Sequence, residues 1–282
     1  MIMVKDKKKK NIFFDKLKSR ANWVRIETLK IHKIAPETRL ASSLSAVEIF
    51  TTLYYGKIIK FNSKNIHAEN RDRLIISKGH GSISFYPVLA DCGYFPKEEL
   101  LNVCKEGSIL GGIPDSIIPG YETINGSLGH GLGVGCGMAL ALKRKKRKER
   151  VIVLVGDGEL YEGSVWEAVM FAAEHKLDNL ILIVDNNKVC MLDYCNKILD
   201  LAPLADKFKT FKWDVKEIDG HNVRQLYHAL AMFKKSSNSR PKVLIANTVK
   251  GKGVPRLETD SLSHIKNLTA SEADSLIKGL QP

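Results

Sequence analysis

Apolar and polar positions alternate at helical spacing over residues 22–56, and Pro36 interrupts the run. The apolar positions before and after that proline are Ile26, Leu29 and Ile34, then Leu44, Val47, Ile49 and Leu53. Because a proline disfavours helical backbone before it and cannot donate a helical hydrogen bond, the pattern predicts two helices. The first ten residues contain five lysines. We therefore expect residues 1–20 to be a basic N-terminal tail that precedes one domain spanning residues 21–282.

Five short runs of β-branched and other apolar residues follow, with stretches of helical spacing between them. They lie at 74–76, 151–155, 180–184, 215–218 and 243–246. Strands of a parallel sheet that is covered on both faces are apolar without alternation. The order of strands and helices predicts an α/β fold with a mainly parallel sheet and helices on both faces.

Glycine and polar residues follow each of the five runs. The segments are SKGH at 77–80, GDGE at 156–159, DNN at 185–187, DGH at 219–221 and TVKGKG at 248–253. In a parallel sheet these segments all emerge at the carboxyl edge, where open α/β sheets bind their ligands. We expect the functional site at this edge.

Asp157 stands between two glycines immediately after an apolar strand. Without a Cβ on either side, the backbone can turn tightly and approach a ligand closely. Twenty-seven residues separate Gly158 from Asn186, which is enough for one helix and one strand, so Asn187 should reach the same edge. Carboxylate and amide oxygens, completed by phosphate and water oxygens, suit Mg²⁺. The alternative is a loop whose aspartate only caps the following helix.

The helix expected between these two loops has Ser164 and Glu167 at the spacing of a capping box, and apolar residues cover most of its circumference, as in a buried helix. A second glycine-rich stretch has glycines at 126, 129, 131, 133, 135 and 137. Each glycine inside a helix costs about 1 kcal/mol relative to alanine. One explanation for these glycines is close packing between helices, including packing across a subunit boundary. The other is a ring that lies against the backbone of residues 126–129. Both explanations can hold.

Composition narrows the class of protein. The chain has 44 lysines and arginines against 31 acidic residues, a net charge of +13. Much of the excess lies in two runs, at 5–10 and 143–150, without aromatic residues between the charges, which favours a solvated surface over nucleic-acid binding. The five cysteines contain no C-x-x-C pair, which argues against a disulfide framework or a zinc site. With no apolar run near 20 residues and no signal peptide, we expect a cytoplasmic protein.

Taken in order, these motifs resemble the N-terminal, thiamine diphosphate-binding half of transketolase, in the form of the short stand-alone subunit of split transketolases. The resemblance runs from about residue 22 to about residue 270. It rests on SSLS at 42–45, RDR at 71–73, SKGH at 77–80, GSLGHG at 126–131, GDGELYEG at 156–163, DNNK at 185–188, DGH at 219–221 and KGKG at 250–253. The GDG and NN pair is the cofactor signature of the family.

The resemblance implies a role for each matching residue. Asp157, the Asn187 side chain and the Val189 main-chain carbonyl would hold the metal, Mg²⁺ or alternatively Ca²⁺ or Mn²⁺, that bridges to the diphosphate. The cofactor-binding residues would be His80, Gly126, Ser127, Leu128, Gly156, Gly158, Glu159, Lys250 and His264, in addition to Asp157 and Asn187. His80 and His264 would also be catalytic residues beside the thiazolium. Glu162 would be a catalytic glutamate that reaches toward the partner's active site across a dimer, and Lys252 is a near neighbour that competes for the role of Lys250.

Two positions depart from the family. The family usually has histidines where this chain has Arg39 and Ile113, and both normally contact the sugar substrate. Isoleucine can neither form a hydrogen bond nor transfer a proton, whereas arginine keeps its donors but remains cationic. The resemblance therefore implies an intact cofactor site with a specialised sugar substrate or an altered acyl transfer.

The glutamate that activates the cofactor in this family lies in the following domain, and this chain ends at Pro282. The resemblance thus implies a separate pyrimidine-binding subunit, with homodimerisation of this chain within a dimer of heterodimers, and we expect the chain alone to be inactive. The expected function is transfer of a two-carbon ketol unit from a ketose to an aldose in carbohydrate metabolism. The alternatives are an acyloin synthase or decarboxylase subunit that uses a 2-oxo acid donor, and a non-catalytic scaffold or nucleic-acid-binding protein.

Overall fold

A five-stranded sheet forms the centre of the computed structural model, which describes the backbone of residues 2–281 and the side chains of residues 11–281. All neighbouring strands are parallel, in the order β1-β2-β3-β5-β4. The strands are β1 (Arg73–Ile76), β2 (Val151–Gly156), β3 (Leu180–Asn186), β4 (Asp214–Asp219) and β5 (Lys242–Asn247). Each predicted strand lies within an observed one, and the predicted α/β fold class is confirmed.

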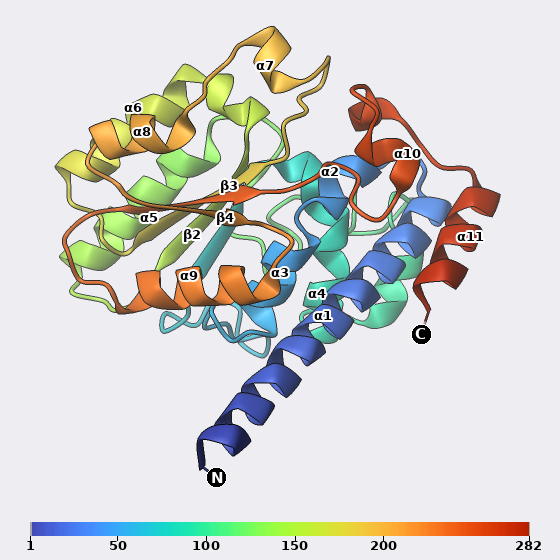
Figure 1. Cartoon of the computed structure of the whole chain (residues 1–282), viewed down its shortest axis with the longest axis horizontal. Helices are drawn as coiled ribbons and strands as arrows, with labels where there is room; N and C mark the ends of the chain where they lie inside the picture. Colours follow the sequence, from blue (N-terminus) through green and yellow to red (C-terminus); the bar gives the residue numbers. More distant parts are fainter. Residues whose placement is uncertain (1, 282) are drawn as a thin grey trace.

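Helices cover the sheet and extend beyond it (Figure 1). The longer helices are α1 (Ile2–Ile34), α3 (Val47–Tyr54), α5 (Gly131–Arg144), α6 (Gly163–Glu174), α9 (Val223–Lys235) and α11 (Ala270–Leu280). The shorter ones are α2 (Leu40–Leu44), α4 (Tyr86–Asp91), α7 (Cys195–Ile198), α8 (Leu204–Thr210) and α10 (Pro255–Glu258), with 3₁₀ helices η1 (Gly79–Ser84), η2 (Lys97–Leu101), η3 (Gly158–Tyr161) and η4 (Ser263–Ile265).

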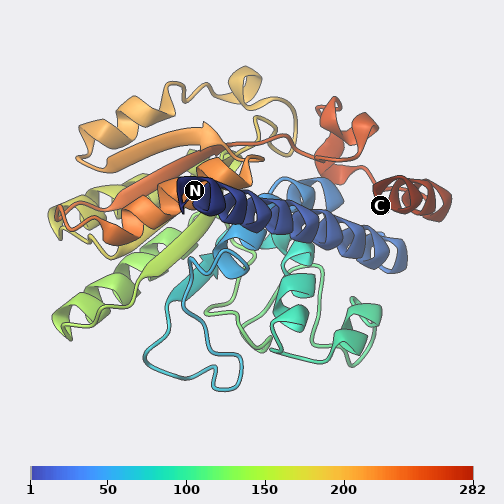
Figure 2. The same ribbon diagram turned by 60° about the horizontal axis from the view of Figure 1, so that its bottom comes forward.

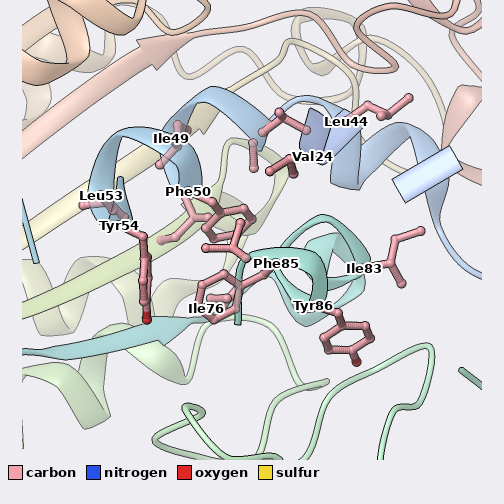
Figure 3. Close-up of a cluster of buried hydrophobic side chains, with 14 of the residues drawn as sticks. Val24, Leu44, Ile49, Phe50, Leu53, Tyr54, Ile76, Ile83, Phe85 and Tyr86 are labelled. Carbon is pink, nitrogen blue, oxygen red and sulfur yellow. The ribbon is translucent and has the colours of Figure 1, made fainter. Parts of the chain in front are cut away.

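Each face of the sheet carries its own apolar core, because successive residues of a strand point to opposite faces. Ile152 belongs to a core that includes α1, α3 and α9, whereas the next residue, Val153, belongs to a core that includes α5, α6 and α8. Figure 1 shows α6 and α8 on one side of the sheet and α9 on the other. Figure 3 shows part of the first core, where the rings of Phe50 and Phe85 stack with centroids 4.8 Å apart.

The edge strand β4 is less covered than its apolar pattern predicts. Lys216 and Glu217 are exposed, and no residue of β4 is fully buried. The strand pairs only with β5 and lies at the end of the sheet, so one of its two edges has no neighbouring strand. The expectation of burial on both faces holds for β2, β3 and most of β5 and is wrong for β4.

No change of structure marks the predicted boundary between a tail and a domain near residue 20, because α1 is one continuous helix that ends at Ile34. Phe14 and Leu17 are 3% and 2% exposed, since they pack with Val223 and Tyr227 of α9. Figure 2 shows α1 crossing the molecule from the side of α9 to α11. The lysine run at 5–10 belongs to this helix, and its side chains lie outside the described part. The predicted break at Pro36 is confirmed, but the second expected helix is divided into α2 and α3.

The helix α6 differs from its prediction in two ways. Its N-cap residue is Glu162, and the Ser164 hydroxyl donates instead to the Gly129 carbonyl (3.0 Å), so the predicted capping box is not formed. Only one side of the helix is buried, because Met170 and Phe171 are 49% and 40% exposed. The apolar circumference of α6 therefore continues onto the molecular surface.

Two general properties concern the residues that the structure describes. Among the helices within residues 2–281, none has the length and apolar character needed to cross a bilayer. All five cysteines are free thiols.

The packing of Phe14 can be tested by Phe14→Ala. Loss of a buried phenylalanine side chain should lower the free energy of unfolding by roughly 3 kcal/mol, measured by urea denaturation. The matched control is Ile12→Ala, because Ile12 is 48% exposed on the same helix, and its effect should stay within about 0.5 kcal/mol. Equal effects of both substitutions would show that the first turns of α1 do not pack as described.

Candidate active site at the carboxyl edge of the sheet

Asp157 lies at the carboxyl end of β2 and is buried. Its Oδ1 accepts a hydrogen bond from the Gly158 N–H (2.8 Å), and its Oδ2 accepts one from the Lys188 N–H beyond β3. The two loops therefore meet, as their spacing predicts. Burial, and after it the charge of Asp185, raises the pKa of Asp157. A cation beside this carboxylate would relieve both effects.

The alternative in which Asp157 only caps the following helix is not what the structure shows. Asp157 caps the single turn η3 through the Gly158 N–H, whereas the long helix α6 starts after Glu162. The second carboxylate oxygen is directed to the loop after β3. The Asp157 side chain thus connects the loops after β2 and β3, in addition to capping one turn.

Oxygen atoms of the loop after β3 complete a candidate metal site with Asp157. Asn187 is buried, and its Oδ1 accepts a hydrogen bond from the Val189 N–H (3.2 Å). The Val189 carbonyl oxygen accepts a hydrogen bond from Lys250 Nζ (2.7 Å). Carboxylate, amide and carbonyl oxygens are the ligands that Mg²⁺ takes. The three residues fit a divalent cation, and the Val189 carbonyl already attracts a positive charge.

Lys250, rather than Lys252, faces this site. Besides Val189, its Nζ contacts the Cys190 carbonyl (3.2 Å) and His264 Nδ1 (3.1 Å). Burial and the nearby charge of Lys78 lower the pKa of Lys250. Lys252 instead points outward and lies 3.6 Å from Glu258, with 39% of its side chain exposed. The structure distinguishes the two lysines that the sequence leaves as competitors.

Asp185 and Lys78 form a fully buried ion pair directly behind the site, with 0% and 1% of their side chains exposed. Asp185 also accepts hydrogen bonds from Ser45 Oγ (2.6 Å) and Thr248 Oγ1. Lys78 Nζ donates in addition to the Ser42 carbonyl (2.9 Å). Although burial alone would raise the pKa of Asp185, Lys78 outweighs that effect and keeps the pKa below its usual value.

Lys78 and Asp185 stand within sequence motifs, but the sequence alone assigns neither residue a role. The signal that could have found them is a lysine and an acid in two loops that the parallel sheet brings to one edge. The structure shows that this pair joins the segment after β1, the carboxyl end of β3 and the segment after β5 to Ser45, which follows α2. The ion pair between Lys78 and Asp185 therefore holds these segments in place from the interior of the protein.

Glu159 has a similar organising position. Its Oε1 accepts hydrogen bonds from the Ser77 hydroxyl and from the Gly129 N–H (2.9 Å), and its Oε2 accepts one from the Gly156 N–H (3.2 Å). The side chain is buried. These contacts tie the glycine-rich loop to the ends of β1 and β2. A role in positioning the loop fits this geometry better than the direct cofactor contact implied by the resemblance.

The glycines of residues 126–137 serve different purposes. A Cβ on Gly131 would lie 2.5 Å from the Ser77 side chain, and one on Gly135 would lie 2.5 Å from Val153 Cγ2, so both are required for packing on the sheet. By contrast, nothing lies within 4 Å of a Cβ on Gly133 or Gly137. These two glycines, with Ala168 and Phe171 among others, line an open groove of about 440 Å³ between α5 and α6. Close packing within the chain therefore explains only some of the glycines.

The loop at the start of this stretch has an unusual backbone. Gly126 and Gly129 have φ values of +127° and +83°, which disfavour residues with a Cβ. Between them Ser127 is exposed and Leu128 is half-buried. Glu162 is also exposed, and its Cβ would lie 2.6 Å from a Cβ on Gly129. Ser127, Leu128 and Glu162 are thus on the surface, where a ligand or a second chain can reach them.

His80 and His264 lie together on the inner side of the site, with ring centroids 5.0 Å apart. His264 Nδ1 also lies 3.5 Å from Ser42 Oγ. Burial and the charge of Lys250 lower the pKa of His264 to about 3, and burial and Lys78 lower that of His80. Both imidazoles are neutral near pH 7. Neutral rings can each accept as well as donate a hydrogen bond.

The two departures from the family lie beside this cluster. Arg39 starts α2 and is half-buried, and its charge contributes to the lowered pKa of His264 after burial and Lys250. Ile113 is 54% exposed, and its Cγ2 would lie 3.5 Å from a Cβ on Gly79 or on Gly126. The structure therefore places Ile113 beside Gly79, the residue before His80, and Arg39 close enough to His264 for its charge to act on that ring.

Comparison with known proteins gives the class of this chain. The family "Transketolase, thiamine diphosphate binding domain" matches residues 18–281, and the chain belongs to that family. It is 37% identical over 273 residues to one subunit of the apulose-4-phosphate transketolase of Actinobacillus succinogenes, covering 96% of this chain and 98% of that protein. It is 37% identical over 254 residues to the 6-deoxy-6-sulfo-D-fructose transketolase subunit SqwG of a Clostridium species, covering 90% and 92%.

Longer transketolases match over part of their length. The human enzyme is 36% identical over 263 residues, which are 93% of this chain and 41% of the human protein. The crystal structure of Campylobacter jejuni transketolase superposes with a TM-score of 0.88 at 30% identity, over 94% of this chain and 42% of that one. The chain is thus a transferase, the thiamine diphosphate-binding subunit of a transketolase, and the predicted family is confirmed. These relatives do not favour the 2-oxo acid-dependent alternative.

The role of the buried ion pair can be tested by Lys78→Met. An uncompensated Asp185 in this position should lower the free energy of unfolding by about 3–5 kcal/mol, measured by urea denaturation at pH 7. Adding Asp185→Asn removes the unpaired charge, so the double variant should be more stable than Lys78→Met alone.

The control for this experiment is Lys97→Met, which breaks an ion pair with Asp91 where 59% of the lysine side chain is exposed. Its effect should stay below about 1 kcal/mol. If the double variant Lys78→Met, Asp185→Asn is less stable than Lys78→Met, the ion pair with Lys78 is not the main interaction that stabilises the buried Asp185 carboxylate.

Proposed function

We propose that this chain is the diphosphate-binding subunit of a heteromeric transketolase that transfers a two-carbon ketol unit from a ketose to an aldose. A separate pyrimidine-binding subunit completes the active site, and two copies of each chain form a dimer of heterodimers. We place this activity in cytoplasmic carbohydrate metabolism. The observation that carries the proposal is the buried Asp157 carboxylate, whose two hydrogen bonds come from uncharged backbone groups, facing the Asn187 loop across the carboxyl edge.

In this proposal Asp157, the Asn187 side chain and the Val189 carbonyl hold Mg²⁺, or Ca²⁺ or Mn²⁺ in its place. When bound, thiamine diphosphate supplies the nucleophilic carbon that accepts the two-carbon unit. Lys250 lies near enough to the Val189 carbonyl to donate to a diphosphate oxygen beside the metal. The bare backbone at Gly156 and Gly158 allows the diphosphate to approach closely.

The proposed roles of His80 and His264 follow from their neutrality. Each ring can take a proton from a hydroxyl of the sugar or return one to its oxygen, because neither imidazole is already charged near pH 7. Lys250 and the half-buried Arg39 keep the surroundings positive, which stabilises negative charge that develops on a sugar oxygen. Ser127 and Leu128 border the same mouth and are proposed to contact the pyrimidine side of the cofactor.

Exposed apolar residues support the proposed partner subunit. They lie in three loops around the carboxyl edge and are Ile113, Ile117, Ile124, Met191, Leu192, Leu262 and Ile265, exposed by between 40% and 70%. Exposed apolar side chains gathered around one edge are typical of interaction sites. The groove between α5 and α6, with Glu162 at its border, supports contact with a second copy of this chain.

Arg39 and Ile113 bear on the substrate. The relatives from A. succinogenes and Clostridium act, by their names, on apulose 4-phosphate and on 6-deoxy-6-sulfo-D-fructose. We propose that the present chain likewise acts on a specialised sugar rather than on the common ketose phosphates. An apolar Ile113 beside Gly79 and Gly126 removes one hydrogen-bonding group from the mouth, and Arg39 adds a permanent positive charge.

The metal site is tested by titrating the two-subunit complex with thiamine diphosphate and Mg²⁺ in a calorimeter. Asp157→Ala should weaken cofactor binding by at least about 100-fold, because it removes the one carboxylate among the three proposed ligands. Asp178→Ala, at the amino end of β3 where Asp178 pairs with Lys143 (2.7 Å), is the control and should bind normally. Equal binding by both variants, or none by the native complex, would reject the cofactor role and favour a scaffold.

The substrate proposal is tested by the double variant Arg39→His, Ile113→His. Restored hydrogen bonds of about 1–3 kcal/mol should raise kcat/KM for a common ketose phosphate donor by about tenfold or more, with the partner present. Met232→His, on α9 and 44% exposed, should leave this value unchanged. If the double variant does not gain activity on such donors, Arg39 and Ile113 do not determine donor specificity.

A further inference from the structure

A buried carboxylate, Glu48 on α3, lies behind the loop that carries Lys250. Its Oε1 accepts a hydrogen bond from Arg25 Nη2 on α1 (2.7 Å), and its Oε2 lies 2.9 Å from His221 Nδ1. The side chains of Glu48 and Arg25 are 9% and 8% exposed. Burial alone would raise the pKa of Glu48, but the hydrogen bond from His221 and the charge of Arg25 outweigh it and hold the pKa below its usual value. Glu48 is therefore ionised and acts as an acceptor on both oxygens.

Each partner of Glu48 also holds the loop on one side of Lys250. The Val249 N–H donates to His221 Nε2 (2.8 Å), and Arg25 Nε donates to the Lys252 carbonyl (2.9 Å). The loop passes very close to Arg25, because a Cβ on Gly253 would lie 2.6 Å from Arg25 Cδ. Glu48 therefore holds the residues on either side of Lys250 indirectly, through His221 and Arg25.

The same contacts determine which ring nitrogen of His221 carries the proton. The backbone N–H of Val249 can only donate, so His221 Nε2 must be the acceptor. The hydrogen of a neutral ring then lies on Nδ1, where it donates to Glu48. A hydrogen on Nε2 would face the Val249 N–H and break that contact.

We propose that Glu48, His221 and Arg25 form a positioning triad that sets the place of Lys250 over the Val189 carbonyl, with His221 as the neutral tautomer protonated on Nδ1. None of the three is a catalytic residue, because each acts through the loop at 249–253. The connection to catalysis rests on the proposed function, in which Lys250 binds the diphosphate. This arrangement explains the DGH segment at 219–221. A Cβ on Gly220 would lie 2.4 Å from Thr248 Cγ2 and would prevent the close approach of the loops after β4 and β5.

Two substitutions of His221 separate the two ring contacts. In His221→Gln the amide oxygen can reach the position of Nε2 and accept from Val249, whereas in His221→Asn the shorter amide reaches only Glu48. The control is His228→Asn, an exposed histidine on α9. We expect His221→Asn to exchange the Val249 amide hydrogen about tenfold faster than the native chain, the effect of one lost hydrogen bond, and His221→Gln to restore slow exchange.

Binding and tautomer measurements complete the test. In the two-subunit complex, His221→Asn should raise the KM for thiamine diphosphate about tenfold with kcat largely retained, and His221→Gln should recover most of the affinity. Nitrogen-15 NMR of the native chain should show the His221 hydrogen on Nδ1. A hydrogen on Nε2, or equal exchange and equal KM in the Asn and Gln variants, would overturn the proposal.

The tautomer and amide-exchange results do not depend on thiamine diphosphate. If the native complex fails to bind the cofactor while these two results hold, the proposed function fails and the triad remains. If both variants fail to fold, the tautomer of the native chain alone decides the question.

Discussion

The buried ion pair between Lys78 and Asp185 is the constraint on which the site depends. Two opposite charges in the interior are tolerated only when they are close and when their remaining hydrogen-bonding capacity is used. Here Ser45, Thr248 and the Ser42 carbonyl meet that need, and these groups come from the helical layer and from the loop after β5. The arrangement therefore brings the loops after β1 and β5 and the carboxyl end of β3 to one place, whether or not a ligand is bound.

Three buried carboxylates at this edge are stabilised in three different ways. Asp185 has a cationic partner and a pKa below its usual value, whereas Glu159 accepts only from uncharged donors and has a raised pKa because burial dominates. Asp157 also accepts only from backbone N–H groups, and Asp185 adds repulsion. Of the three, Asp157 has the most to gain from an added cation, and its Oδ2 accepts a hydrogen bond from the loop that carries Asn187 and Val189. The electrostatics of the chain thus set Asp157 apart from Asp185 and Glu159.

The surface of the molecule is consistent with an enzyme that is completed by other chains. Apolar residues such as Ile117 and Ile124 surround the mouth of the site, and Gly133 and Gly137 leave an open groove between α5 and α6. A single chain does not bury either surface, although most of its other apolar residues lie in two well-covered cores.

Hydrophobic periodicity and loop spacing were enough to predict the parallel α/β architecture and the meeting of Asp157 with the Asn187 loop. These are local properties of the sequence, and a parallel sheet brings the carboxyl ends of its strands to one edge. The sequence by itself did not determine that α1 continues through residues 11–20, that α6 is buried on one side only, or that Lys250 rather than Lys252 faces the site. The pairings of Lys78 with Asp185 and of Glu48 with His221 and Arg25 join residues between 23 and 173 positions apart. Such contacts become visible only in the folded chain. A buried polar or charged side chain must find a partner in place of water, and folding determines which partners lie within reach.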